Sequence, residues 1–199
     1  LGGAPAQGVD LLNALSKTFP FVVILILFIT FLILVRTFQS ILLSAKAIIL
    51  DLISIGIAFS ALVVVFKFGV GTYQLEQIEA WVLILLFAIL FGLSMDYEIF
   101  IVSRIREAHD RGASNEEAIR EGMRSSGTVV TAAALIFISA VTGLATGHFA
   151  GLQQLGVGLA IGVIVDATII RGLLLPSAMV LLGRWNWWMP RHGKTPTLK

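Results

Sequence analysis

Two aspartates lie deep inside apolar stretches of the sequence, where a bilayer excludes charge. Asp96 follows Trp81 by 15 residues, which is about 22 Å along a helix. Asp166 follows Leu155 by 11 residues, about 16 Å along a second one. A carboxylate near the bilayer centre costs several kcal/mol, so it must face other helices and marks a functional site by default. Such a carboxyl group can take up and release protons, which is the chemistry of proton-driven transport.

Polar and small residues surround Asp96. Tyr97 and Glu98 follow it directly, which adds a hydroxyl group and a second carboxyl group. Gly92, one helical turn before Asp96, leaves room for a neighbouring helix or a water molecule. The residues expected to line a pocket beside Asp96 are Gly92, Leu93 and Phe100. The alternative interpretation is a buried carboxylate that only ties helices together.

Arg171 lies five residues after Asp166 in the same apolar stretch. Five residues turn an ideal α-helix by roughly 140°, so these two side chains are not expected to pair. Arg171 is instead expected to reach Asp96 or Glu98 on another helix, or to extend toward the membrane surface. For Asp166 a structural role and a functional role are both left open.

Other residues in the apolar stretches have simpler interpretations. Asp51 and Lys46 stand near the start of a stretch and are expected among the lipid headgroups. Pro176 is expected to kink the last helix, because it lacks a backbone donor. Small-residue spacing before Asp166 predicts close helix packing rather than a nucleotide loop. The residues in question are Gly156, Gly158 and Gly162.

The composition requires a membrane protein. The chain has 199 residues, of which 57% are hydrophobic and 13% charged, and its mean hydropathy is +0.95. With no cysteine, disulfides, thiolate-bound metals and cysteine nucleophiles are excluded. No phosphate-binding loop supports ATP hydrolysis, and no cofactor is implied. The three histidines are scattered, so a metal site is not expected, and they are His109, His148 and His192.

A window of about 20 apolar residues, the length needed to cross a bilayer, finds five spans. They cover residues 19–35, 47–66, 80–102, 127–147 and 155–182. The predicted fold class is therefore an all-α, polytopic transmembrane helix bundle over residues 19–183. Because the sequence starts with neither a methionine nor a basic region, we expect it to begin inside a larger protein.

A polar loop, residues 104–126, separates the third and fourth spans. Gly112 is a predicted helix stop. Ser114 and Glu117 form a predicted capping box, which starts a short helix running from Asn115 to about Met123. This loop is interpreted as a solvated connector, with partner docking as the alternative.

Basic residues set the orientation, because they concentrate on the cytoplasmic side of membrane proteins. If the first span enters the inner side at Arg36, eleven basic residues lie inside, against Lys17 and Lys67 outside. This places the N-terminus outside and the C-terminal tail, residues 184–199, in the cytoplasm. Tryptophans are expected at both interfaces. They are Trp81 outside, and Trp185, Trp187 and Trp188 inside, with Asn186 among them.

Several sequence blocks resemble the MMPL branch of the resistance-nodulation-division (RND) transporter superfamily. The resemblance covers essentially the whole chain. The blocks are Gly92-Leu93-Ser94-Met95-Asp96-Tyr97-Glu98-Ile99-Phe100, Ser103-Arg104-Ile105-Arg106-Glu107, Thr131-Ala132-Ala133-Ala134, Val165-Asp166-Ala167-Thr168-Ile169-Ile170-Arg171 and Gly183-Arg184-Trp185-Asn186-Trp187-Trp188-Met189-Pro190.

This resemblance implies a proton-driven secondary transporter that exports lipids or other hydrophobic compounds across a bacterial inner membrane. It makes Asp96 and Tyr97 a proton relay, facing a second Asp-Tyr pair in an N-terminal half of the transporter or in another chain. Residues 1–18 would be the remnant of an extracytoplasmic porter domain. The sequence departs from the family near Ser44, where a proline or a similar residue is expected, and near Asp51, where an amide is expected. Assembly as a homo-oligomer is left open.

Two other classes of protein remain as alternatives. A sterol-sensing-like scaffold shares the fold without transport. An intramembrane aspartyl protease would use Asp96 and Asp166 as a dyad, but its expected Gly-x-Gly-Asp and Pro-Ala-Leu blocks are missing. Basic residues at the inner face are explained by orientation and anionic lipid, so nucleic acid is not an expected partner.

Overall fold

The computed structural model describes residues 4–69 and 78–187, and every element in these residues is helical. The α-helices are α1 (Ala4–Phe38), α2 (Ile41–Leu62), α3 (Ala80–Asp110), α4 (Asn115–Ala145), α5 (Ala150–Val165) and α6 (Leu175–Leu182). Two π-helices, η1 (Val63–Lys67) and η2 (Asp166–Leu174), extend α2 and α5, and a 3-10 helix, η3 (Gly183–Trp187), follows α6.

In the part of the chain that the structure describes, five helical segments are long and apolar enough to cross a membrane, which confirms the predicted fold class. They are Lys17–Phe38, Ile41–Lys67, Ala80–Asp110, Asn115–Ala145 and Ala150–Leu182. Each begins earlier or ends later than predicted, because polar helical turns project beyond the apolar core. The described part of residues 1–18, from Ala4, is helical and continuous with the first span.

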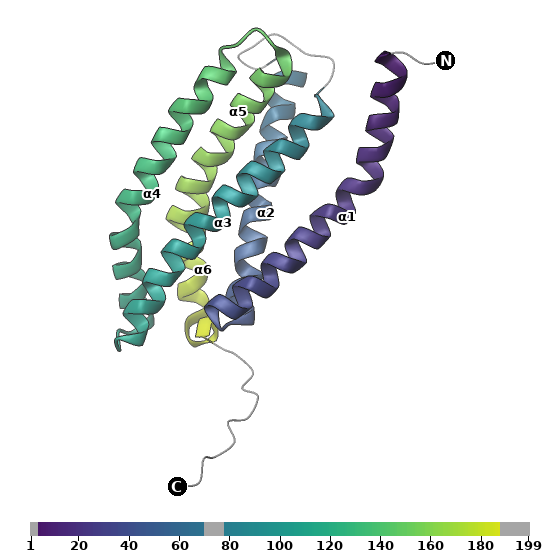
Figure 1. Cartoon of the computed structure of the whole chain (residues 1–199). Helices are drawn as coiled ribbons and strands as arrows, with labels where there is room; N and C mark the ends of the chain where they lie inside the picture. The colour runs from purple at the N-terminus through teal and green to yellow at the C-terminus, as the bar shows by residue number, and fades with distance from the viewer. Residues whose placement is uncertain (1–3, 70–77, 188–199) are drawn as a thin grey trace.

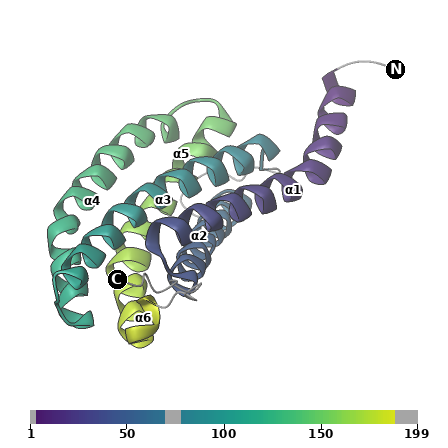
Figure 2. The same cartoon turned by 60° about the horizontal axis from the view of Figure 1, so that its bottom comes forward.

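Three helices form the centre of the bundle. α2, α3 and α5 pack against one another, α4 covers α3 and α5, and α1 contacts α2 and α3 from the other side (Figure 1). Toward its N-terminal end α1 diverges from the other helices, as both views show (Figure 2). Only 6% of its apolar window is buried. Bulky apolar side chains such as Phe21, Ile24 and Phe28 are exposed along it, as suits a helix surrounded by lipid.

Glycines allow α5 to approach its neighbours closely, as their spacing predicted. A Cβ on Gly156 would lie 2.6 Å from the backbone nitrogen of Ala145 and 2.8 Å from the carbonyl oxygen of Val141. A Cβ on Gly162 would lie 2.5 Å from a methyl carbon of Leu90. Gly156 therefore sets a backbone-to-backbone contact with α4, whereas Gly162 meets a side chain that can move.

Replacing Gly156 with Ala is expected to destabilise the bundle by about 1–3 kcal/mol, the usual cost of overpacking. The matched control is Gly143→Ala on α4, where an added Cβ meets nothing within 4 Å. Both Gly→Ala changes gain about 1 kcal/mol of helix propensity. The difference in stability between the two variants therefore measures the packing contribution of Gly156. The measurement is the thermal unfolding midpoint of the purified protein in nanodiscs. Equal midpoints for the two variants would contradict the packing argument.

The turn between α3 and α4 has the predicted end signals. α3 ends at Asp110, and Gly112 has a φ of +98°, a conformation that glycine adopts without strain. The capping box is confirmed: the Ser114 hydroxyl accepts from the Glu117 backbone N–H, and the Glu117 carboxylate accepts from the Ser114 backbone N–H. The separate helix from Asn115 to about Met123 is wrong, because α4 continues without a break to Ala145.

The chain closes on itself at the end of the last span. The Asn186 amide donates to the carbonyl oxygen of Met179 at 2.6 Å, and the Trp187 indole donates to the Asn115 side-chain oxygen at 3.2 Å. The Trp187 ring stacks on His109 with centroids 4.3 Å apart. Trp187 is therefore held by the bundle, while Trp185 is exposed, as a residue of an interfacial belt would be. Trp188, His192 and the rest of the predicted tail lie outside the described residues.

Candidate functional site

A buried polar cluster joins α2, α3 and η2 in the centre of the bundle. The hydroxyl of Ser94 on α3 lies against Oδ1 of Asp51 on α2 and 3.0 Å from Oδ1 of Asp166 on η2. Arg171 places its Nη2 atom 2.7 Å from the same hydroxyl and also donates to the Ser94 carbonyl oxygen. Exposed fractions are 1% for Asp51, 6% for Asp166 and 3% for Arg171. One serine thus connects three ionisable side chains.

Asp166 and Arg171 form an ion pair, contrary to the prediction from helical spacing. Nε of Arg171 lies 2.8 Å from Oδ2 of Asp166. The prediction assumed an α-helix, but residues 166–174 form a π-helix. Its hydrogen bonds join residues five apart, which brings those side chains to the same face. Arg171 therefore forms its ion pair on its own helix rather than with Asp96 or at the membrane surface, and it also interacts electrostatically with Glu98 on α3, as expected.

The π-helix ends at Leu174, two residues before Pro176. Pro176 lies in the first turn of α6, inside the continuous helical span Ala150–Leu182, so it removes a backbone donor from the middle of that span. The π-helical turns that precede Pro176 are the backbone irregularity that the structure shows at this proline.

Asp51 and Lys46 do not lie among lipid headgroups, and that prediction is wrong. Asp51 is enclosed by the bundle, and the Nζ atom of Lys46 is also buried. Lys46 interacts electrostatically with Glu98, whose side chain is buried on α3. The reason is that α2 starts at Ile41, so both residues already belong to a packed helix. The sequence position alone did not show which face they occupy.

Tyr97 connects the buried cluster to the rest of α3. The guanidinium carbon of Arg171 lies 5.2 Å from the centre of the Tyr97 ring, within the range of a cation–π contact. The Tyr97 ring is half-buried. It therefore stands between the cluster and the outer face of α3.

Asp96 is exposed on that outer face, away from the buried cluster. It lies 16 residues after the first residue of α3, about 24 Å along the helix and deep within the span. Gly92 is exposed on the same stripe, with open space at its Cβ position, and Leu93 and Phe100 are partly buried. The structure thus places the predicted residues in two groups. Glu98, Asp166 and Arg171 lie inside the bundle, whereas Asp96 lies outside it, with Tyr97 between them.

Sequence reasoning missed Ser94 and the role of Asp51 in the cluster. A helical count was available for Ser94: it precedes Glu98 by four residues, so both side chains point into the bundle, and it precedes Asp96 by two, so Asp96 points away. Nothing comparable was available for Asp51, because its contacts come from α3 and η2. Among the described residues, no group of three or more histidines, aspartates and glutamates has the geometry to hold a metal ion.

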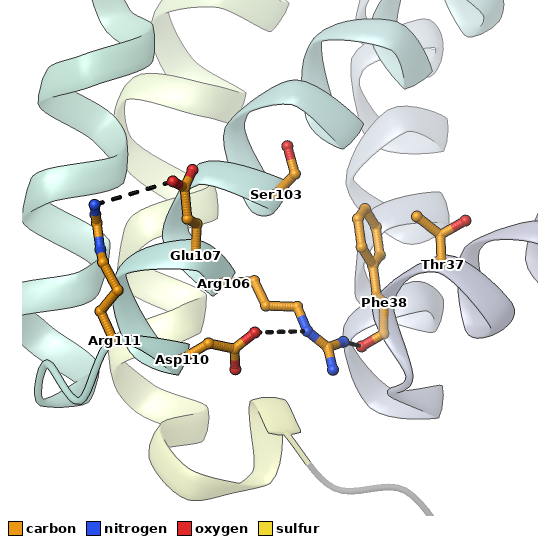
Figure 3. Close-up of a pocket in the computed structure, with 7 residues that line it drawn as sticks. All are labelled: Thr37, Phe38, Ser103, Arg106, Glu107, Asp110 and Arg111. Carbon is orange, nitrogen blue, oxygen red and sulfur yellow. Dashed lines mark hydrogen bonds and ion pairs between the residues drawn. The ribbon is translucent and has the colours of Figure 1, made fainter.

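A separate pocket of about 380 Å³ lies where the end of α1 meets the end of α3. Figure 3 shows its charged residues paired with one another or with backbone. Nε of Arg106 lies 3.7 Å from Oδ2 of Asp110, and Nη1 of Arg106 donates to the carbonyl oxygen of Phe38 at the end of α1. Arg111 lies 3.9 Å from Glu107. The charged side chains that line this pocket therefore compensate one another. The hydrogen bond from Arg106 to Phe38 connects α3 to the end of α1, and we call this contact the joint between the two helices.

Comparison with known proteins gives consistent results. The MMPL family description matches residues 1–198. The heme uptake protein MmpL11 of Mycobacterium tuberculosis is 37% identical over 96% of this chain and 20% of its own length. The mycolic acid-containing lipids exporter MmpL11 of Mycolicibacterium smegmatis is 36% identical over 96% and 20%. The trehalose monomycolate exporter MmpL3 of M. tuberculosis is 36% identical over 98% and 21%.

The chain thus spans about a fifth of the length of these relatives. Their names describe transport proteins and exporters rather than enzymes, in agreement with the sequence-based prediction of a transporter.

Proposed function

Because the chain belongs to the MMPL family, we propose that it is the membrane part of a proton-driven exporter of lipids or other hydrophobic compounds. The observation that carries this proposal is the position of Asp96. It is an exposed carboxylate in the middle of an apolar span. A charge in contact with lipid at this depth is too costly, so the open face of α3 needs a protein partner.

The exposed stripe of α3 suits contact with another helical unit. Small residues stand one turn apart before Asp96, which lets a helix approach closely. The stripe consists of Leu85, Ala88, Gly92, Asp96, Ser103 and Glu107. On this proposal the partner is the N-terminal half of the transporter, or a second chain, and it supplies the facing Asp-Tyr pair. A homo-oligomer is a further form of assembly.

Asp96 and Tyr97 act as the proton relay in this proposal. A proton that crosses the membrane delivers about 2.3 kcal/mol per 100 mV, so one or two protons bias a helix movement by several kcal/mol. The Tyr97 ring contacts Arg171, so a change at Asp96 has a direct route to the buried cluster. Glu98, Asp166 and Arg171 serve as accessory polar residues.

The arrangement in the membrane follows from the basic residues. We place the N-terminus outside, the C-terminus in the cytoplasm and the bundle in a bacterial inner membrane. In this proposal residues 1–18 are the remnant of an extracytoplasmic porter domain, residues 104–126 form the cytoplasmic loop, and residues 184–199 form the cytoplasmic tail. The ends that carry most of the basic residues, those of α1, α3 and η3, gather at one end of the bundle (Figure 1).

The proposal is tested with the full-length protein in vesicles that carry an imposed pH gradient. Lipid efflux and internal pH are recorded together. We expect export to stop when a protonophore collapses the gradient, and to be indifferent to ATP. Export that persists without a gradient would overturn proton coupling. If the protein exported no lipid, and if replacing Asp96 and Asp166 had no effect on any function of the protein, the sterol-sensing-like scaffold would be favoured.

A further inference from the structure

Glu98 and Lys46 interact electrostatically with the buried cluster around Ser94 or with each other, and are counted with it here. Together these residues include more acidic than basic side chains. Three carboxyl groups, those of Asp51, Glu98 and Asp166, face two cations, Lys46 and Arg171. If all five were ionised, one negative charge would remain uncompensated inside a low-dielectric bundle, which is strongly unfavourable. One proton on one carboxyl group makes the cluster neutral.

Hydrogen bonding at Ser94 identifies the carboxyl group that holds this proton. The Ser94 hydroxyl has one hydrogen and can accept two hydrogen bonds, but it lies against oxygens of both Asp51 and Asp166 and also meets Arg171. Two ionised carboxylates cannot both accept from a single hydrogen. One carboxyl group must therefore donate to the serine oxygen.

Asp166 is not that donor, because its other oxygen accepts from Arg171 at 2.8 Å, and the guanidinium stabilises its ionised form. Within the described residues, Asp51 has Ser94 as its hydrogen-bond partner at Oδ1, and its Oδ2 atom has no partner. With a proton on Oδ1, Asp51 donates to the Ser94 hydroxyl, which in turn donates to Asp166. Arg171 donates to the Ser94 hydroxyl and to Asp166. The serine oxygen then makes the three hydrogen bonds that its chemistry allows.

We propose that Asp51 is a second proton-binding carboxyl group of the bundle, in addition to Asp96, and holds its proton in the conformation described. This inference deepens the proposed function and rests on it for its role in transport. The charged groups that face Asp51 are Glu98 on α3 and Asp166 and Arg171 on η2, while Lys46 stands on α2 itself. Glu98 is the competing proton holder, but a proton there leaves the Ser94 contacts unexplained.

Loss of the proton from Asp51 changes the packing of α2. Two carboxylates would then compete for the hydrogen of Ser94, and their repulsion drives α2 and η2 apart. Because Arg171 contacts both Ser94 and Tyr97, the same movement reaches the exposed face of α3. Proton release at Asp51 is thereby coupled to the position of the Asp96 helix.

The test is infrared difference spectroscopy of the full-length protein in nanodiscs, which detects the carbonyl stretch of a protonated carboxyl group. The variants are Asp51→Asn and, as the matched control, Glu98→Gln. An asparagine amide donates to Ser94 as the protonated acid does, so the Asp51→Asn protein is expected to fold. We expect one protonated-carboxyl band of the wild type to be lost in Asp51→Asn. Glu98→Gln removes the surplus negative charge, but we expect the band to be kept there, because the Ser94 oxygen still requires a carboxyl donor between Asp51 and Asp166. The opposite pattern, or an unchanged band in Asp51→Asn, would overturn the proposal.

A second readout is thermal stability as a function of pH. The wild type is expected to lose stability when titration to higher pH removes the proton from Asp51, and Asp51→Asn is expected to lose less. Equal pH dependence would count against the proposal. Neither measurement involves transport. A failure of proton-driven export would appear only in the vesicle experiment, and the protonation of Asp51 would still be tested by the infrared and stability measurements.

Discussion

Replacing Asp96 with Asn is expected to abolish proton-coupled export while leaving expression and folding intact. A positioned proton-transferring group contributes about 10²–10⁴-fold to the step that it serves, so we expect a loss of about 100-fold or more. Folding is spared because Asp96 is exposed and lies outside the buried cluster. The measurement is lipid efflux together with internal pH, in vesicles that hold equal amounts of the two full-length proteins.

The control for this prediction is Asp110→Asn. Asp110 is also an exposed carboxylate on α3, but it stands at the last residue of the helix in the polar joint with α1. Its loss is expected to leave export near the wild-type level. Retention of both export and proton movement in Asp96→Asn would make Asp96 structural, and Asp166 would become the next candidate for the relay.

Replacing Arg171 with Met is expected to cause the largest loss of stability. It leaves Asp166 as an unpaired buried charge and removes the donor to Ser94, and breaking a buried pair in this way costs about 3–5 kcal/mol. The expected result is a strongly lowered unfolding midpoint in nanodiscs. The matched control is Arg104→Met, which breaks an exposed pair with Glu107 and is expected to cost at most about 1 kcal/mol.

A double variant separates the charge from the packing. Arg171→Met combined with Asp166→Leu removes both charges and replaces them with apolar side chains of similar size. Such replacements are often close to neutral, so we expect the double variant to recover much of the stability that Arg171→Met loses. If the double variant were as unstable as the sum of the two single variants, the two residues would not act as a pair.

The sequence predicted the elements better than the contacts. Long apolar stretches determine membrane spans, so five spans could be found, and the Ser114 capping box is a local signal. The Asp166–Arg171 pair was missed because the angle between residues five apart was calculated for an α-helix, whereas η2 has π geometry. The burial of Asp51 was missed because it depends on contacts with α3 and η2, which are distant in the sequence.

For Asp96 and Asp166, the position along the helix could be predicted from the sequence, but the direction of the side chain could not. Depth within a span is predicted by counting residues, and both Asp96 and Asp166 lie inside helical segments that are long and apolar enough to span a membrane. The direction of each side chain depends on how the helices pack. Packing turns Ser94 and Glu98 inward and leaves Asp96 on the open stripe of α3.

The contacts of Asn186 and Trp187 with the start of α4 also affect how the protein is made. Asn115 precedes Asn186 by 71 residues, and a ribosome that adds about 5–20 residues per second needs about 4–14 s to reach it. During synthesis, the start of α4 therefore waits for these partners while α4, α5 and α6 enter the membrane. This end of the bundle is completed only when Trp187 leaves the ribosome, so a chain stopped before it lacks the contact that fastens the last span.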